Sequence, residues 1–207
     1  MMPEGNLPAL EARVRRDIEM TAHPRMEWMK PRMFHGRPAL DVLIIGAGQS
    51  GLCIAFALMR DRVSNLLVID RAPAGREGPW VTFARMPTLR SPKDQTGPDL
   101  GIASLTFEAW YDATEGAGAF AGLGLIPSQA WHDYLQWYRR VLDLPVRNDT
   151  EAVAIAPGAL DDLGRRLELL AGRHQGGAVA QGPAVILDVG DLEPMRAQLH
   201  GQGHHGL

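Results

Sequence analysis

Hydrophobic positions recur with a helical period in two segments of the chain. Residues 7–20 place apolar side chains three and four positions apart and charged ones on the other faces, a pattern typical of an amphipathic helix. Residues 128–142 repeat it with large aromatic side chains, from a candidate N-cap at Ser128 to a stop at Pro145. We expect an N-terminal helix that packs on the main domain and a second helix with a broad apolar face.

Between these helices, strand-like and helix-like patterns alternate. The apolar run 42–45 leads into a glycine-rich turn, a helix-like segment follows at 52–62, and a second apolar run ends at Asp70. This order predicts a βαβ unit with a right-handed crossover and a parallel sheet. By contrast, residues 71–125 show little periodicity, and a loop of this length is either functional or mobile.

The C-terminal third predicts a small antiparallel unit beside the parallel sheet. Residues 150–157 and 165–172 are interpreted as the strands of a hairpin or meander, and 182–191 as a further buried strand. The predicted domains are therefore an N-terminal helix and connector at 1–40, an incomplete main domain at 41–190 and an irregular tail at 191–207.

Composition limits the function classes. The 207 residues are enough for one sizeable core, and a net charge of −3 gives no global attraction to nucleic acid or anionic membranes. No apolar stretch reaches about 18 residues, and the N-terminus lacks a signal-peptide core. The single cysteine, Cys53, excludes an intrachain disulfide and is expected to be an inert thiol. We expect a cytoplasmic protein with a small-molecule substrate and neither a nucleic-acid nor a membrane partner.

The turn after the first apolar run has the spacing G-x-G-x-x-G, at Gly46, Gly48 and Gly51. Its place between a strand and a helix is what a dinucleotide-binding turn requires. The first glycine permits the tight turn, the second lets the backbone approach a pyrophosphate, and the third lets the helix pack closely on the strand. The helix N-terminus offers N–H groups to the phosphates. Asp70 lies about 20 residues further on, where a ribose-binding acid is expected. The alternative is a glycine-rich turn in an unrelated α/β protein.

FAD and NAD both use this fingerprint, and the residues after Asp70 help to separate them. An acid at this position disfavours the 2′-phosphate of NADP by like charge, although Arg71 weakens the argument. A simple NAD-binding domain would continue into its next βαβ unit, whereas this chain enters a long loop with "GREGPW" and "TLRSPK". The pattern therefore favours FAD.

Five motifs occur in one order along residues 7–170: "VLIIGAGQSGL", "LLVIDRAPAGREGPW", "ARMPTLRSPK", "LTFEAWY" and "IPSQAWHDYLQWYRRVLDLPV". Together they resemble the FAD domain of the flavin-containing monooxygenase-like FAD/NAD(P)-binding oxidoreductases, of the bacterial urate-hydroxylase-like type. The resemblance implies an α/β fold, namely a Rossmann-like FAD/NAD(P)-binding domain with a parallel sheet, a small β-meander and an N-terminal helical arm. It also implies an FAD-dependent monooxygenase that takes electrons from NAD(P)H.

The same resemblance implies a cofactor site. The glycine turn would surround the FAD pyrophosphate, Asp70 would hold the adenosine ribose, and Trp80 would lie near the flavin-side loop. Val153 would meet the adenine through its backbone. The predicted cofactor-binding residues are Gly46, Gly48, Gln49, Ser50, Gly51, Asp70, Arg71, Trp80 and Val153. The sequence identifies no catalytic residue and no metal site.

Other polar and aromatic residues have two interpretations each. The cationic residues Arg85, Arg90 and Lys93 could stabilise an anionic flavin or an acidic substrate, but a surface or ion-pair role is expected. Trp80 either stacks on the flavin or fills the core. His132 is expected on a helix surface, and the histidines between residues 200 and 205 are expected in a flexible terminus rather than a metal site.

The resemblance ends before the chain does. Members of the family continue into an NAD(P)H-binding domain with its own glycine turn, and in these 207 residues no second G-x-G-x-x-G lies between a strand-like and a helix-like pattern. Where a strand should end in small residues, "VILDVGD" carries Asp188. We therefore expect a truncated or frame-shifted form, altered from about residue 176. The alternatives are a non-catalytic dinucleotide-binding fragment and an NAD-dependent dehydrogenase.

Overall fold

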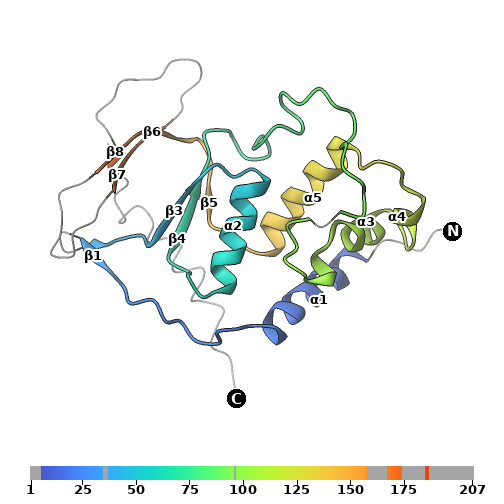
Figure 1. Ribbon diagram of the computed structural model, residues 1–207, viewed down its shortest axis with the longest axis horizontal. Helices are drawn as coiled ribbons and strands as arrows, with labels where there is room; N and C mark the ends of the chain where they lie inside the picture. Colours follow the sequence, from blue (N-terminus) through green and yellow to red (C-terminus); the bar gives the residue numbers. More distant parts are fainter. Residues whose placement is uncertain (1–5, 35–36, 96, 158–166, 174–184, 187–207) are drawn as a thin grey trace.

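A three-stranded parallel sheet lies at the centre of the described part of the chain (Figure 1). Its strands are β3 (Val42–Ile45), β4 (Leu66–Ile69) and β5 (Val146–Arg147), in the spatial order β3-β4-β5. Helix α2 (Gln49–Arg60) connects β3 to β4 and confirms the predicted βαβ unit. The computed structural model describes residues 6–34, 37–95, 97–157, 167–173 and 185–186.

The other helices lie on one side of this sheet, and the other strands lie towards its opposite side (Figure 1). The helices are α1 (Leu7–Met20), the short 3-10 helix η1 (Ala103–Leu105), α3 (Phe107–Glu115), α4 (Ala119–Gly122) and α5 (Ser128–Val141). The strands are β1 (Met33–Phe34), β2 (Arg37–Pro38), β6 (Thr150–Pro157), β7 (Leu167–Arg173) and β8 (Val185–Ile186).

Neighbouring residues of the parallel sheet contribute to two different apolar clusters, because side chains alternate between the faces of a strand. Ile44 and Val68 belong to the large core that the helices share. Leu67 and Ile69 form a second cluster, against which Leu43 packs. Both faces of β4 are therefore buried, as is usual for a strand inside a parallel sheet.

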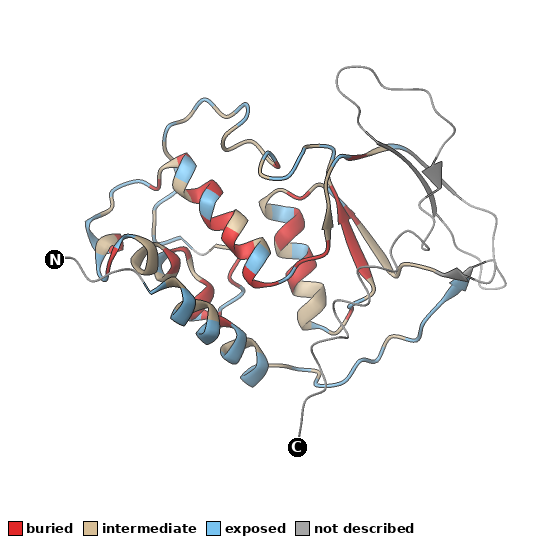
Figure 2. Ribbon diagram, turned by 180° about the vertical axis from the view of Figure 1, so that it is seen from behind, coloured by how far each residue is buried: buried red, intermediate tan, exposed pale blue. Residues whose placement is uncertain are grey.

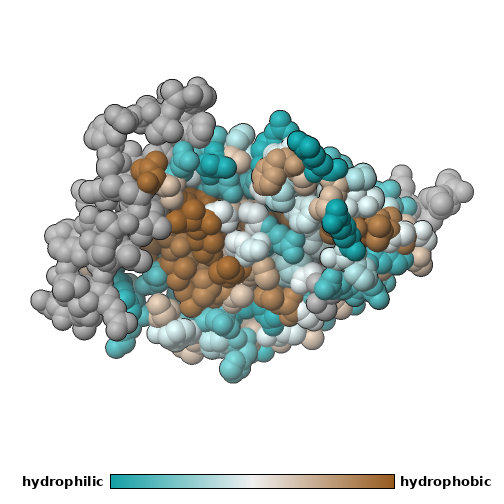
Figure 3. Space-filling model, turned by 45° about the horizontal axis from the view of Figure 1, so that its top comes forward, coloured by the Kyte–Doolittle hydropathy of each residue, from teal (hydrophilic) through white to brown (hydrophobic). Residues whose placement is uncertain are grey.

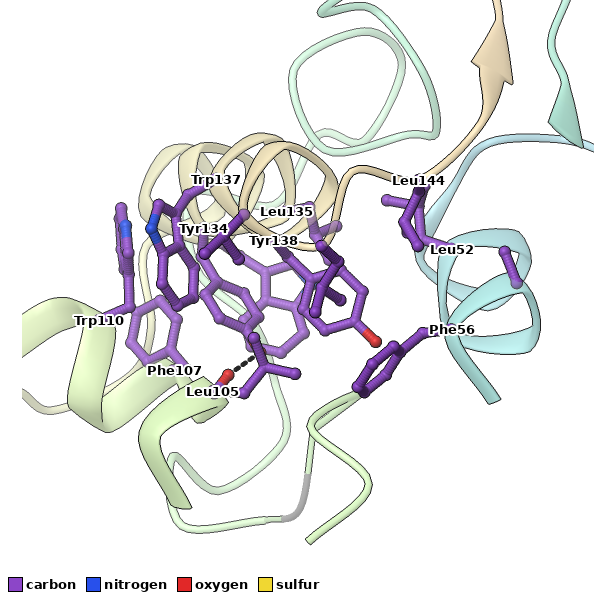
Figure 4. Packing of buried hydrophobic residues seen from close by; sticks show 14 of the residues in the cluster. Leu52, Phe56, Leu105, Phe107, Trp110, Tyr134, Leu135, Trp137, Tyr138 and Leu144 are labelled. Carbon is purple, nitrogen blue, oxygen red and sulfur yellow. Dashed lines mark hydrogen bonds between the residues drawn. The ribbon is translucent and has the colours of Figure 1, made fainter. Parts of the chain in front are cut away.

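Helix α5 supplies the middle of the large core (Figure 4). Tyr134, Trp137 and Tyr138 are almost completely buried. The hydroxyl of Tyr134 donates to the carbonyl of Leu105 at 2.8 Å, and that of Tyr138 donates to the carbonyl of Pro98 at 2.8 Å. Burial raises the pKa of both tyrosines well above the usual value, so both stay neutral donors. The predicted helix with a broad aromatic face is confirmed, but Ser128 does not cap it: its Oγ donates to the carbonyl of Met86.

The segment 71–125 is more regular than the sequence predicts. It contains η1, α3 and α4. Their aromatic residues Phe107, Trp110 and Phe120 are buried, and Figure 2 shows by colour how buried and exposed residues alternate along the helices. The carboxylate of Asp112 accepts the backbone N–H groups of Gly118 and Phe120 and so joins α3 to α4. Because α3 has 9 residues and α4 has 4, neither is long enough to give a clear helical period.

The N-terminal helical arm is confirmed. Asn6 caps α1 by accepting the backbone N–H of Ala9 at 3.1 Å. Val14 on its inner face is 0% exposed, and α1 contacts η1, α3 and α5. Asp17 accepts the Ser104 hydroxyl at 2.6 Å. The helix is therefore an integral part of the core.

The small meander is confirmed in outline. β6, β7 and β8 pair in antiparallel fashion in that order. Of the strand expected at 182–191, the structure describes Val185 and Ile186. The interpretations of Asp188, of the C-terminal histidines and of the tail at 191–207 lie outside the described residues.

No helix in the described segments is long and apolar enough to cross a membrane. Half-exposed apolar side chains include Ile45 at the end of β3 and Ile54 on α2. Figure 3 shows a broad apolar area in the region of these two elements.

The hydroxyl of Tyr134 yields a stability prediction. Tyr134→Phe keeps the ring but leaves the buried carbonyl of Leu105 without its donor, so we expect a loss of about 1–2 kcal/mol in the free energy of unfolding, measured by urea denaturation. The control is Trp28→Phe, because Trp28 is 61% exposed and its indole donates to the carbonyl of Asp61 at the surface. We expect that control to stay within about 0.5 kcal/mol, and equal losses would contradict the assignment.

Candidate functional site

The glycine turn joins the carboxyl end of β3 to the N-terminus of α2. Gly46 has φ +103, a backbone conformation that favours glycine. Its N–H donates to the carbonyl of Ile69 at 2.7 Å, which ties the turn to the end of β4. Gly48 is the N-cap of α2 and provides no side-chain cap. The turn therefore presents the N–H groups of a helix start, a favourable place for an anion.

Gly51 brings α2 close to β3. A Cβ atom on Gly51 would lie 1.8 Å from the carbonyl oxygen of Gly46, so no other residue fits without a shift of the backbone. At Gly48 a Cβ would lie 3.7 Å from the Cα of Gly78, an ordinary contact. The structure thus requires glycine at positions 46 and 51 for the fold itself, whereas position 48 tolerates a methyl group in the structure without ligand.

Asp70 connects the turn to the segment that follows β4. One carboxylate oxygen accepts the backbone N–H of Ala47 at 2.7 Å, and the other accepts that of Ala72 at 2.8 Å. These bonds orient the carboxylate beside the turn. A carboxylate has about four lone-pair sites, so the predicted bond to a ribose hydroxyl is compatible with both.

The start of β6 lies beside Asp70. The backbone N–H of Thr150 donates to the carbonyl of Asp70 at 2.9 Å. Arg71 is largely exposed, with Nη1 3.9 Å from an Oε1 oxygen of Glu151. Val153 is 50% exposed on β6. Their predicted roles at the adenosine end of a dinucleotide stay predictions.

A pocket of about 440 Å³ opens at the start of α2 and is lined by residues that include Gln49, Trp80, Leu89, Arg90, Ile126 and Trp131. The indole N–H of Trp131 donates to the side-chain oxygen of Gln49 at 3.1 Å. The rings of Trp80 and Trp131 meet edge to face, with centroids 6.4 Å apart. The structure therefore brings Gln49 and Trp80 together in one aromatic pocket, next to the N-terminus of α2.

Trp80, which lines this pocket, has a buried polar atom. Its Nε1 has no hydrogen-bond partner within the described part of the chain. A buried N–H without an acceptor costs free energy, so such a group commonly marks a place where a ligand or water supplies the acceptor. The two interpretations of Trp80, core filling and flavin contact, are thus compatible: the ring is partly buried and also lines the pocket.

The cationic residues separate into two kinds. Lys93 donates to the carbonyls of Phe120 and Ala121, and its Nζ lies 4.6 Å from the centroid of the Phe120 ring. It therefore has the structural role that the sequence favours. Arg85 and Arg90 are exposed, and Arg90 lines the pocket.

The expectation of a surface histidine at position 132 is wrong. His132 is 7% exposed. It shares one face of α5 with Gln136 and Arg139, which lie four and seven positions further on and bond to Glu77. The segment after β4 contacts this face through Glu77, and His132 is buried although the adjacent Asp133 is exposed.

Sequence reasoning overlooked Glu77, a buried carboxylate within "GREGPW". An acid between two glycines is typical of a surface turn, and only the fold shows which segments cover it.

Cys53 is half-buried on α2, and burial, with a smaller effect of the Asp99 charge, raises the pKa of its thiol. This fits the inert thiol that we expect. No cluster of potential metal ligands occurs within the described segments.

Comparisons with known proteins fit this geometry. The profile of the FAD-NAD(P)-binding family matches residues 43–191. The FAD-dependent urate hydroxylase of Xanthomonas campestris pv. campestris is 50% identical over 167 residues, which are 81% of this chain and 35% of that protein. The chain therefore spans about a third of the length of this relative.

Solved structures of two ornithine hydroxylases resemble the fold. Ornithine hydroxylase from Pseudomonas aeruginosa matches with a TM-score of 0.53 and 18% identity, over 67% of this chain and 35% of that one. Ornithine N-hydroxylase from Kutzneria sp. 744 matches with a TM-score of 0.53 and 19% identity, over 66% of this chain and 34% of that one. With the glycine turn and the profile match over most of its length, the chain belongs to the FAD-NAD(P)-binding family.

Proposed function

We propose that this chain is the FAD-binding portion of a monooxygenase-like flavoprotein oxidoreductase that takes its electrons from NAD(P)H. The profile match and the 50% identical FAD-dependent relative support the proposal. The predicted boundaries are part of the proposal: an arm and connector at 1–40, an incomplete FAD-binding domain at 41–190 and a tail at 191–207. FAD supplies the electron transfer and the oxygen chemistry when it is bound.

One observation carries the proposal: the aromatic pocket begins at the first residue of α2. Gln49 starts the helix and also lines the pocket with Trp80 and Trp131. A pyrophosphate bound at the helix N-terminus would therefore have a pocket for a planar aromatic ring directly beside it. Asp70 accepts the backbone N–H of Ala47 in the same turn, and the nucleoside end would lie there.

Each residue of the proposed site has a physical task. The N–H groups at the start of α2 bind the phosphates, and the missing side chain at Gly48 lets the backbone approach them. The Asp70 carboxylate, already oriented by two backbone N–H groups, accepts a ribose hydroxyl. The rings of Trp80 and Trp131 form aromatic walls against which the ring system packs.

The NAD(P)H step belongs to the complete protein. The resemblance assigns NAD(P)H binding to a second glycine turn between a strand and a helix, and no second turn with those neighbours is predicted from these 207 residues. We therefore propose that polypeptide beyond these residues supplies that site, and that the 207-residue chain binds FAD without turning over.

Flavin binding tests the proposal directly. We expect the purified 207-residue chain to bind one FAD, seen as quenching of free FAD fluorescence and as protein-bound flavin absorbance after gel filtration. Dithionite should bleach the bound flavin, whereas NADPH and NADH should not reduce it at a catalytic rate. Binding of NAD without FAD would favour the dehydrogenase alternative and contradict the proposal.

The glycine positions give a second, residue-level prediction. Gly48→Ala leaves the fold intact because its Cβ makes an ordinary contact at 3.7 Å, but the methyl group lies where the pyrophosphate approaches. We expect the Kd for FAD to rise about tenfold, which is about 1.4 kcal/mol, with an unchanged melting temperature. Gly51→Ala forces a Cβ to 1.8 Å from the Gly46 carbonyl, and we expect a loss of stability of about 3 kcal/mol.

Gly122→Ala is the matched control, because a Cβ there meets nothing within 4 Å. It should change neither the melting temperature nor the Kd for FAD appreciably. If Gly48→Ala bound FAD as tightly as the unmodified chain, the pyrophosphate assignment would be wrong.

A further inference from the structure

The segment between β4 and the aromatic pocket contains a buried carboxylate that the cofactor assignments leave unused. Glu77 is 4% exposed. Its Oε1 accepts Nη1 of Arg139 at 2.6 Å and Nδ2 of Asn148. Its Oε2 accepts the backbone N–H of Gly75 at 2.9 Å and Nε2 of Gln136 at 3.2 Å. Four N–H groups therefore converge on one carboxylate.

These donors come from three separate parts of the fold. Arg139 and Gln136 belong to α5, Asn148 follows β5, and Gly75 lies in the same segment as Glu77. Arg139 also donates to the side-chain oxygen of Asn148 at 2.9 Å. Asn148 in turn donates to the carbonyl of Ala72 at 3.0 Å, at the start of the segment. The network thus holds both ends of residues 72–77 against α5 and the end of β5.

The residues directly after Glu77 reach the glycine turn and the pocket. Gly78, with φ +72, has its Cα 3.7 Å from the place that a Cβ of Gly48 would occupy. Trp80 lines the pocket and meets the ring of Trp131, which lies on α5 like two of the donors. One carboxylate therefore links the helix that carries one pocket tryptophan to the segment that carries the other.

We propose that Glu77 is a positioning residue of the cofactor site, which holds Gly78 and Trp80 in place over the glycine turn for a bound dinucleotide. This inference rests on the proposed function and deepens it. A site that is already in its bound geometry loses less conformational freedom on binding. A buried carboxylate that accepts from a guanidinium and three further donors holds a segment firmly in one conformation.

The geometry separates this role from general stability. The large core uses Tyr134, Trp137 and Tyr138 of α5, whereas Glu77 contacts Gln136 and Arg139. Loss of the network frees the segment 72–80 while the aromatic core keeps its contacts. A variant at Glu77 should therefore weaken cofactor binding by more than its loss of stability explains.

The test compares Glu77→Gln with the unmodified 207-residue chain. An amide keeps one acceptor oxygen but turns an N–H₂ group towards two of the four donors. We expect the Kd for FAD to rise at least fivefold at a temperature where both proteins are folded. We also expect stronger acrylamide quenching of tryptophan fluorescence, and this increase should disappear in a Trp80→Phe background, because it reports the freed Trp80.

Asp112→Asn is the matched control, since Asp112 also accepts two backbone N–H groups but joins α3 to α4, away from the glycine turn. It should lower the melting temperature and leave the Kd for FAD within twofold.

Gln136→Ala replaces Glu77→Gln if that variant does not fold. It removes a single bond of 3.2 Å and should raise the Kd for FAD two- to threefold, with the same increase in acrylamide quenching.

Three results would overturn the inference. Glu77→Gln, or Gln136→Ala where it replaces that variant, could bind FAD as tightly as the unmodified chain. Asp112→Asn could weaken FAD binding as much as Glu77→Gln does when both variants lose the same amount in melting temperature. Finally, an unmodified chain that binds no FAD would refute the proposed function and the cofactor role of Glu77 with it, while the quenching data would still show whether Glu77 holds the segment.

Discussion

The close approach of α2 to β3 at Gly51 is the constraint on which the rest of the site depends. Only hydrogen fits where a side chain would meet the Gly46 carbonyl. This contact places the N-terminus of α2 at the end of the parallel sheet, where Ala47 bonds to Asp70 and Gln49 lines the aromatic pocket. Both parts of the proposed dinucleotide site therefore adjoin this backbone contact.

Two carboxylates then fix the surroundings of the turn. Asp70 accepts N–H groups from both the turn and the segment after β4. Glu77 joins the same segment to α5. Because Trp131 on α5 also bonds to Gln49, helices α2 and α5 and the segment between them form one connected frame. The pocket is thus bordered by elements that hydrogen bonds hold in register.

The local pattern of the chain was enough to predict the βαβ unit, the glycine turn, the meander and the helices α1 and α5, since each has a clear period or a short-range spacing. The helices between residues 103 and 122 could not be predicted in the same way, because they are short and pack through single aromatic residues such as Phe107 and Trp110. His132 was misjudged because burial of the polar face of α5 depends on a segment far away in sequence.

The candidate site shows the same division. The three glycines and Asp70 follow from spacing alone, whereas the role of Trp80 needed the family resemblance and the pocket needed the fold. The Glu77 network joins residues from position 72 to position 148. No local pattern reveals such contacts, since their chemistry depends on which segments the sheet and α5 bring together.

A crystal structure of the 207-residue chain with FAD would test the central claim most directly. The account predicts the pyrophosphate at the N–H groups of Gly48 to Gly51, and the flavin ring in the pocket against Trp80 and Trp131. Crystals grown with saturating FAD in which this pocket stays empty, or in which the ring lies away from Trp80 and Trp131, would contradict it.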